Sequence, residues 1–285
     1  MSAAQAFAIT PTVGAVGSPA GTAGGSVARA VRGSPAGTPG PVSALVALLT
    51  EAAARHAPLV QVTSLGPEDM LITDAIARHR LPIEVVTLDT GRLPRETYAL
   101  LAQAQRRYGP QGTAIRVIWP EPAAVEIFVH RYGIDGFYDS VEARKACCDA
   151  RKVRPLARAL AGKHGWVTGL RRGQSSERAG IAELETDTAA DGSPRAKINP
   201  LAGWTDEQVW AYLREHDVPV NALHAQGYPS IGCGPCTRAV DDGEDPRSGR
   251  WWWEQASIRE CGLHVGADGR LRRAGARQTS EETVS

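Results

Sequence analysis

Hydrophobic and polar positions follow two different periods along residues 41–216. Apolar residues three or four apart predict amphipathic helices, and short apolar runs between turn residues predict buried strands. The predicted helices are 42–56, 68–79, 95–108, 123–132, 147–161 and 205–216. The predicted strands are 59–63, 83–88, 114–119 and 166–168. This alternation predicts an α/β fold with a parallel twisted sheet and helices on both faces.

Three loops of this predicted fold are the places to look for a ligand. Parallel sheets bind ligands beyond the carboxyl ends of their strands. The loops in question follow Thr63, Leu88 and Thr168. The last predicted helix begins with Thr-Asp-Glu-Gln from Thr205, which is typical of a capping box.

The two ends of the chain differ from its middle. Residues 1–40 are rich in Ala, Gly, Ser, Pro and Thr and predict a disordered extension. They contain no acidic residue but do contain Arg29 and Arg32, as an organelle transit peptide would. Their lower Arg and Ser content favours a plain bacterial extension. We expect the main domain at 41–240, a tail at 241–265 and a disordered basic and polar end at 266–285.

Global charge and hydropathy exclude two classes of partner. The formal net charge is +1, which gives no indication of bulk nucleic-acid or membrane binding. No apolar run approaches the roughly 20 residues that span a bilayer, and the start of the chain lacks a secretory signal pattern. We therefore expect a cytoplasmic protein with no nucleic-acid or membrane partner.

The five cysteines form two pairs and one single residue. The pairs are Cys147 with Cys148 and Cys233 with Cys236, and Cys261 stands alone. An odd number in a chain of this size argues against a disulfide framework. Four metal ligands and one reactive thiol is the simplest division. Zinc and iron–sulfur clusters both accept four thiolates. Adjacent cysteines at a helix start favour the cluster, but their spacing leaves zinc open.

Six short strings occur in a fixed order and carry a family resemblance. They are Leu88-Asp-Thr-Gly-Arg92, Cys147-Cys-Asp-Ala-Arg-Lys152, Gly169-Leu-Arg-Arg-Gly-Gln-Ser175, Ile231-Gly-Cys-Gly-Pro-Cys-Thr-Arg238, Arg250-Trp-Trp-Trp-Glu254 and Glu260-Cys-Gly-Leu-His264. Over about residues 45–265 the set resembles the assimilatory adenylyl-sulfate (APS) reductases, the cluster-bearing branch of the sulfonucleotide reductases. The related phosphoadenylyl-sulfate (PAPS) reductases share the last string but usually lack the cysteine pairs.

The resemblance implies a fold, a reaction and a cofactor. The fold would be that of the adenine-nucleotide α-hydrolases, and the reaction would reduce APS to sulfite and AMP in sulfate assimilation and cysteine biosynthesis. Cys147, Cys148, Cys233 and Cys236 would hold a [4Fe-4S] cluster. The Cys261 thiolate would attack the sulfate sulfur, and a thioredoxin- or glutaredoxin-like protein would resolve the thiosulfonate. No such domain follows residue 265, so we expect a separate reductant; the family also allows a homo-oligomer.

The resemblance also implies a set of substrate contacts. A phosphosulfate group should be lined by cations. The candidates by motif are Lys152, Arg171, Arg172, Arg247 and Arg250, with Ser64, Leu88, Asp89 and Gly169 on the nucleotide side. The loop from Ser64 to Asp69 stands at a helix start, where backbone N–H groups suit an anion. It lacks the usual Ser-Gly-rich sequence, and Pro67 removes one donor. Asp89 could instead cap the next helix.

A nucleophile near the chain end suits a segment that moves. Cys261 would have to visit buried substrate and then meet a partner protein. We expect residues 241–250 to act as the hinge and residues 251–253 to dock the tail by packing. His264 has no assigned role.

Three alternatives remain from the sequence. An ATP-dependent tRNA thiolase shares the fold class and sometimes holds a cluster. Those enzymes carry a Ser-Gly-Gly-x-Asp-Ser loop that this chain lacks, and they lack the string around Cys261 that this chain has. A PAPS reductase is the near alternative within the family. The third is a zinc-stabilised binding module without catalysis.

Overall fold

The computed structural model describes residues 40–175 and 178–254. The helices of this part are α1 (Pro41–Arg55), α2 (Pro67–Arg78), α3 (Arg95–Tyr108), α4 (Pro122–Tyr132), α5 (Val141–Cys148), α6 (Arg154–Leu160) and α7 (Asp206–Glu215). The strands are β1 (Leu59–Thr63), β2 (Ile83–Leu88), β3 (Ile115–Ile118), β4 (Gly165–Val167), β5 (Leu184–Thr188) and β6 (Pro194–Ile198). Short helical turns at η4 (Arg172–Gln174) and η7 (Gly234–Cys236) belong to the loops discussed below.

The strands form one sheet in the order β3-β2-β1-β4-β6-β5. All neighbouring pairs are parallel except β5 with β6, which is antiparallel. Thr63 pairs with Thr87, and Gln61 pairs with Val167, so β1, β2 and β4 end at the same edge of the sheet. This register brings the loops after the three strands together, as the sequence predicts.

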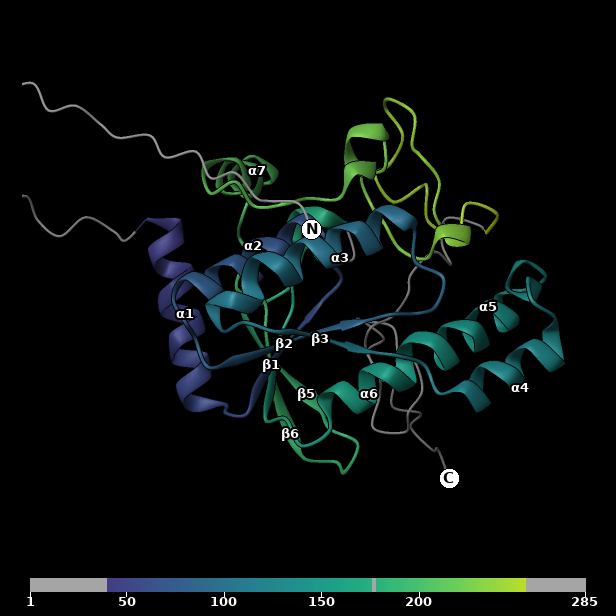
Figure 1. Ribbon diagram of the computed structural model, residues 1–285, viewed down its shortest axis with the longest axis horizontal. Coiled ribbons are helices and arrows are strands. Elements are labelled where there is room, and N and C mark those ends of the chain that lie inside the picture. Colours follow the sequence, from purple (N-terminus) through teal and green to yellow (C-terminus); the bar gives the residue numbers. More distant parts are fainter. Residues whose placement is uncertain (1–39, 176–177, 255–285) are drawn as a thin grey trace, which may run out of the picture. The chain divides into compact units, whose positions relative to one another are not determined.

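Helices cover both faces of the sheet (Figure 1). On one face α1, α2, α3 and α7 pack against alternate strand residues such as Leu59, Val85 and Val167. On the other face α6 packs against the intervening residues, including Val60 and Val86. Successive strand residues point to opposite faces, so apolar residues at consecutive positions serve both cores. The α/β fold with helices on both faces is confirmed.

Two elements differ from the prediction. The predicted helix 147–161 is the end of α5, a π-helical turn η3 (Asp149–Val153) and then α6, so the first cysteine pair closes a helix instead of opening one. Strands β5 and β6 were missed because Arg195 and Lys197 are buried but charged, and they pair with acidic residues of β5. A hairpin with charged residues at buried positions lacks the apolar pattern from which strands are predicted.

Three further predictions concern the start of the last helix, membrane-spanning helices and the two ends of the chain. The capping box at Thr205 is confirmed, because its hydroxyl accepts from the Gln208 N–H and the Gln208 side chain accepts from the Thr205 N–H. No helix within the described ranges combines the length and apolar character needed to cross a membrane. The predicted extension and the tail beyond residue 254, with Cys261 and His264, lie outside the described residues.

Candidate active site

One cavity of about 750 Å³ opens at the carboxyl ends of β1, β2 and β4. Ser64, Leu88 and Gly169 line it from the three strand ends. Its volume is in the range of small-molecule sites, which is roughly 300–1,000 Å³. The cavity is rich in cations, and its lining includes Arg92, Arg144, Arg151, Lys152, Arg171, Arg178, Lys197, Arg247 and Arg250. An anionic ligand of nucleotide size therefore suits this site.

The loop after β1 is closed by its own carboxylate. Asp69 accepts hydrogen bonds from the Ser64 N–H at 2.7 Å and from the Ser64 hydroxyl at 2.6 Å. Burial raises the pKa of Asp69 to about 6, although the bonds from Ser64 oppose this shift. A Cβ on Gly169 would lie 2.5 Å from the Asp69 Oδ1, so only glycine fits opposite this carboxylate. The backbone N–H and the hydroxyl of Ser64, a predicted nucleotide contact, are thus both engaged within the loop.

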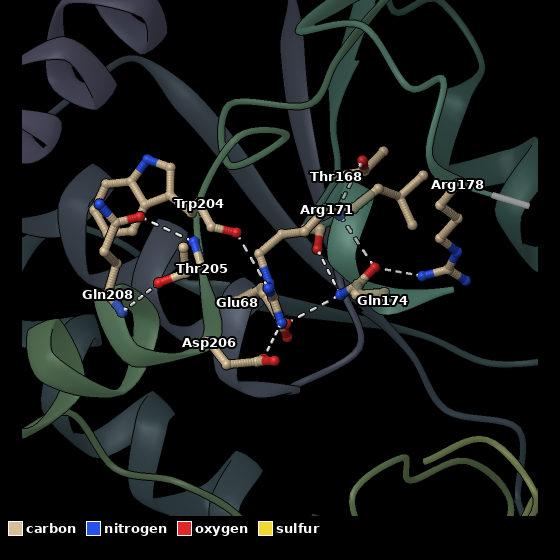
Figure 2. Close-up of polar contacts among 11 residues, drawn as sticks. Glu68, Thr168, Arg171, Gln174, Arg178, Trp204, Thr205, Asp206 and Gln208 are labelled. Atoms are coloured by element: carbon tan, nitrogen blue, oxygen red, sulfur yellow. Dashed lines mark hydrogen bonds and ion pairs between the residues drawn. The ribbon is translucent and has the colours of Figure 1, made fainter. Parts of the chain in front are cut away.

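Arg171 lies at the centre of a polar network beside this loop (Figure 2). Its Nε donates to Glu68 at 2.8 Å, one terminal nitrogen donates to the Trp204 carbonyl at 3.2 Å, and the other pairs with Asp206. Gln174 donates to the same Glu68 oxygen at 3.0 Å. The Arg171 side chain is only 4% exposed. Although it lines the cavity, its guanidinium is held by protein acceptors on three sides.

The loop after β2 connects the sheet to both cysteine pairs. Arg151 donates to the Thr90 carbonyl at 2.9 Å, and the Cys233 thiol lies 3.3 Å from the Thr90 hydroxyl. The Gly234 N–H donates to the Arg92 carbonyl at 2.8 Å. Movement of this loop would therefore disturb both cysteine-bearing segments.

Asp89 shapes the same loop from beneath. Its Oδ1 accepts from the Gly91 N–H at 2.7 Å and from the Tyr98 hydroxyl at 2.8 Å. Burial and the bond to Asp89 raise the pKa of Tyr98 to about 12. Asp89 is 1% exposed and is not part of the cavity lining, and α3 begins after Pro94 without a side-chain cap. The expectation that Asp89 caps the next helix is therefore wrong.

The four described cysteines line the same cavity with their thiols free of disulfides. Cys147, Cys233 and Cys236 belong to one apolar cluster. Burial raises the pKa of Cys236 to about 12, and the neighbouring Cys233 adds to this shift. Burial also raises the pKa of Cys147, while the Arg151 guanidinium beside it opposes the change. A bound cation reverses this preference, because a coordinating thiol is deprotonated.

The donor set of these cysteines fits an iron–sulfur cluster. Within the described ranges no three His, Cys, Asp or Glu side chains already have the arrangement of a single metal-ion site. Four thiols from two segments nevertheless line one cavity, and four thiolates are the usual ligand set of such a cluster.

Three of the cations predicted to contact the substrate line the cavity near the cysteines. Lys152 follows Cys148 across the π-helical turn, and both line the cavity. Arg247 and Arg250 also line it. A Cβ on Gly232 would lie 2.1 Å from an Arg250 guanidinium nitrogen, so the glycine makes room for that side chain.

Arg172, predicted as a substrate contact, lies apart from the other predicted cations. It is exposed, donates to the Ile181 carbonyl at 2.8 Å and lies outside the main cavity. Its neighbour Arg171 points into the Glu68 network, and the backbone then enters the turn η4, so the two adjacent side chains diverge. The motif alone could not distinguish them.

Sequence reasoning missed four side chains near the cysteines and the cavity. Arg151 contacts both the Thr90 loop and Cys147, and Arg178 reaches Gln174 at the cavity wall. Arg144 and Glu254 form a buried ion pair. A usable signal existed for Arg144, which lies three residues before Cys147 and so on the same face of α5.

Comparison with known proteins decides the family. Residues 58–239 match the family described as phosphoadenosine phosphosulfate reductase domain. The chain is 55% identical over 222 residues to the adenosine 5′-phosphosulfate reductase of Allochromatium vinosum, covering 78% of this chain and 84% of that protein. The chain belongs to the adenosine 5′-phosphosulfate reductases of the sulfonucleotide reductase family. The resemblance carried by the six strings is confirmed.

Further relatives agree with this assignment. The adenosine 5′-phosphosulfate reductase of Burkholderia cepacia is 51% identical, over 79% of this chain and 87% of that protein. The crystal structure of the phosphoadenylyl-sulfate reductase from Candida auris, a phosphate complex, has a TM-score of 0.57 and 27% identity. It covers 69% of this chain and 90% of that chain. The adenine-nucleotide α-hydrolase-like sheet is therefore shared across the family.

Proposed function

We propose that the protein reduces APS to sulfite and AMP, with Cys261 as the nucleophile and a thioredoxin-like dithiol as the reductant. One observation carries the proposal: four thiols and a group of cations line one cavity at the strand ends. The phosphosulfate of APS is an anion that such a lining suits. Assimilatory sulfate reduction and cysteine biosynthesis are the setting that this reaction implies.

The reaction balances on one cysteine. The Cys261 thiolate attacks the sulfate sulfur, an S–S bond forms, and the S–O bond to AMP breaks. A thiolate of the reductant then attacks the Cys261 sulfur and releases sulfite, and its second thiol frees Cys261 as the reductant becomes a disulfide. Lys152, Arg247 and Arg250 neutralise charge on the sulfonate oxygens as AMP departs.

The cysteine pairs are the proposed ligands of a [4Fe-4S] cluster. Cys147 and Cys148 would hold it from the end of α5, and Cys233 and Cys236 would hold it from the start and end of η7. When bound, the cluster supplies a structural cross-link and a local electrostatic field, because the dithiol supplies both electrons. The chain's part is to hold the thiols at the cavity wall and to keep Lys152 one turn from Cys148.

The remaining substrate contacts are proposed on the nucleotide side. Ser64, Leu88 and Gly169 line the cavity at the three strand ends and could position the adenosine. Arg171 acts through Glu68, which it holds, and Asp89 acts through the fold of the Thr90 loop.

We propose APS rather than PAPS as the substrate, and the loop after β1 supports this choice. An additional phosphate needs further donors, and the helix start after β1 is a natural source of them. There Asp69 already occupies the Ser64 donors, and Glu68 adds a second carboxylate. Ser64 therefore has no donor left for another phosphate in this arrangement.

Sulfite release tests the proposed function. Wild type with reduced thioredoxin should release sulfite from APS much faster than from PAPS, and Cys261→Ser should release none. Equal rates on both substrates would refute the preference, and full activity of Cys261→Ser would refute the nucleophile. Protection by ATP in place of APS would favour a tRNA thiolase. Zinc without acid-labile sulfide would favour a binding module. A separate reductant, a homo-oligomer and a cytoplasmic location remain predictions from the sequence.

A further inference from the structure

A buried ion pair joins the last described residue to the first cysteine-bearing helix. The Nε of Arg144 donates to Glu254 at 2.6 Å, and a terminal nitrogen donates to its other oxygen at 3.0 Å. The two side chains are 1% and 4% exposed. A two-pronged contact of this kind fixes direction as well as distance. Glu254 is thus held against α5 at Arg144, which lies one helical turn before Cys147.

Trp251 strengthens this attachment. Its ring centroid lies 4.8 Å from the guanidinium carbon of Arg144 and 4.8 Å from that of Arg250. Its side chain is 2% exposed, and its backbone N–H donates to the Cys236 carbonyl at 3.3 Å. Trp251 also has a φ of +45°, a conformation that costs a non-glycine residue free energy unless its surroundings enforce it. The chain therefore makes an enforced turn here and returns to α5.

The preceding loop does not control the direction in which the chain leaves. The ends of residues 237–250 are paired with each other, through a bridge between Thr237 and Arg250 and a 3.0 Å bond from the Arg238 N–H to the Gly249 carbonyl. Arg238 also forms an ion pair with Glu244 inside the loop. Residues 241–250, expected to be the hinge, thus lie within a loop, 237–250, whose two ends are paired with each other.

The position of this attachment has a consequence for Cys261. Cys261 is the seventh residue after Glu254, and seven residue steps of fully extended chain span at most about 25 Å. Arg144 and Trp251 both line the cavity. The length of this chain segment therefore limits how far Cys261 can lie from Glu254, which is fixed at the cavity wall.

We propose that Arg144 and Glu254 are positioning residues: they fasten the base of the tail to the cysteine-bearing helix and thereby direct Cys261 to the substrate. This inference rests on the proposed function of Cys261. The pair would act on the capture of the sulfonate and not on the affinity for APS, because neither side chain is free to bind the ligand.

Glu254→Gln is the first test, since it keeps the shape of the side chain and removes its charge. The rate of adduct formation on Cys261 should fall at least tenfold in single-turnover mass spectrometry with APS and no reductant. The dissociation constant for APS, measured in a Cys261→Ser background, should stay within twofold, and the iron content should be unchanged. Glu142→Gln is the matched control: Glu142 lies on α5 with Arg144, but its pair with Arg131 of α4 is exposed, so the variant should leave all three quantities unchanged.

A second readout does not depend on Cys261. Trypsin should cut after Arg250 at least tenfold faster in Glu254→Gln, because release of Trp251 exposes that bond. The double variant Arg144→Met with Glu254→Met keeps an apolar contact that such sites usually tolerate, but it lacks the fixed geometry and should also form the adduct slowly.

The outcomes separate the two claims. A wild-type rate in Glu254→Gln or in the double variant would overturn the positioning role. So would a slow rate explained entirely by lost iron or weaker APS binding. If wild type forms no adduct at all, the proposed function of Cys261 fails, and the trypsin result still decides whether the pair fastens the tail.

Discussion

The two sides of the cavity use their charged residues differently. The β4 side consists of the loops after β1 and β4. There Arg171 is bound by Glu68 and Asp206, and Asp69 is bound by Ser64. On the cysteine side, Lys152 and Arg247 form no ion pair with a carboxylate in the part of the chain that the structure describes. The β4 side is a preformed frame, and the cysteine side presents cations that a ligand could use. Equally basic motifs therefore have unequal roles.

The largest expected effect tests the thiols of the cysteine side. Cys236→Ser should abolish both the iron–sulfur absorption and sulfite formation, because it removes one of the four ligands of the proposed cluster. Visible absorption, iron content and sulfite release measure this. Phe128→Leu, in the same apolar cluster, is the control and should keep the colour. A colourless Cys236→Ser enzyme with normal turnover would refute the role of the cluster.

Lys152→Met should give the next largest effect. Loss of one cation that faces developing negative charge typically lowers turnover about 100- to 1,000-fold. The free energy of unfolding should change by less than about 0.5 kcal/mol, since no carboxylate among residues 40–175 and 178–254 pairs with this half-buried lysine and would lose its partner. Arg172→Met is the matched control outside the cavity and should retain activity within twofold. Equal losses in both variants would remove the distinction between cavity and surface cations.

Arg171→Met should act mainly on stability. It leaves the largely buried Glu68 without its partner, and breaking a buried ion pair costs about 3–5 kcal/mol. Asp206 is 67% exposed and should contribute little of that cost. Urea unfolding gives the free energy, and APS binding at a temperature where the variant is folded gives the affinity. A stable Arg171→Met protein with greatly weakened binding would make Arg171 a direct ligand contact.

Asp69→Asn should give the smallest change, visible as a pH dependence. The pKa of Asp69 in the fold is about 6, above its ordinary value of 3.8, so the fold favours the protonated form. The resulting stability is present below the unfolded pKa and is lost as the pH rises through about 6. Relative to Asp69→Asn, wild type should lose about 1 kcal/mol between about pH 5 and pH 7. Urea unfolding at the two pH values measures this difference. An equal difference in the free energy of unfolding between wild type and Asp69→Asn at both pH values would contradict a raised pKa.

Much of the fold could be read from the sequence because burial and hydropathy agree there. Strand 83–88 has apolar residues on both faces and was predicted with its observed limits. The hairpin of β5 and β6 could not be read, because its buried Lys197 is made tolerable by Glu185, a partner that only the fold supplies. The break at η3 directly precedes α6, which has Pro155 in its first turn; this residue lacks a backbone N–H and interrupts the helix without changing its hydrophobic period.

The candidate site was predictable in its membership but not in its roles. Motif strings identified Lys152 and the four cysteines as cavity residues. They could not show that Arg171 is bound by acidic residues 35 or more positions away, at Glu68 and Asp206. Nor could they show that Glu254 pairs with Arg144, because the two residues are 110 positions apart in the sequence and only the fold brings them together.

The most direct test of the account is to identify the sulfur that captures the sulfonate. The iron-loaded wild-type protein is mixed with APS in the absence of reductant, digested and analysed peptide by peptide by mass spectrometry. The account predicts one sulfonate on the peptide that contains Cys261, none on those with Cys147 or Cys236, and its release as sulfite when thioredoxin is added. Sulfite production with no modification at Cys261 at any time would contradict it.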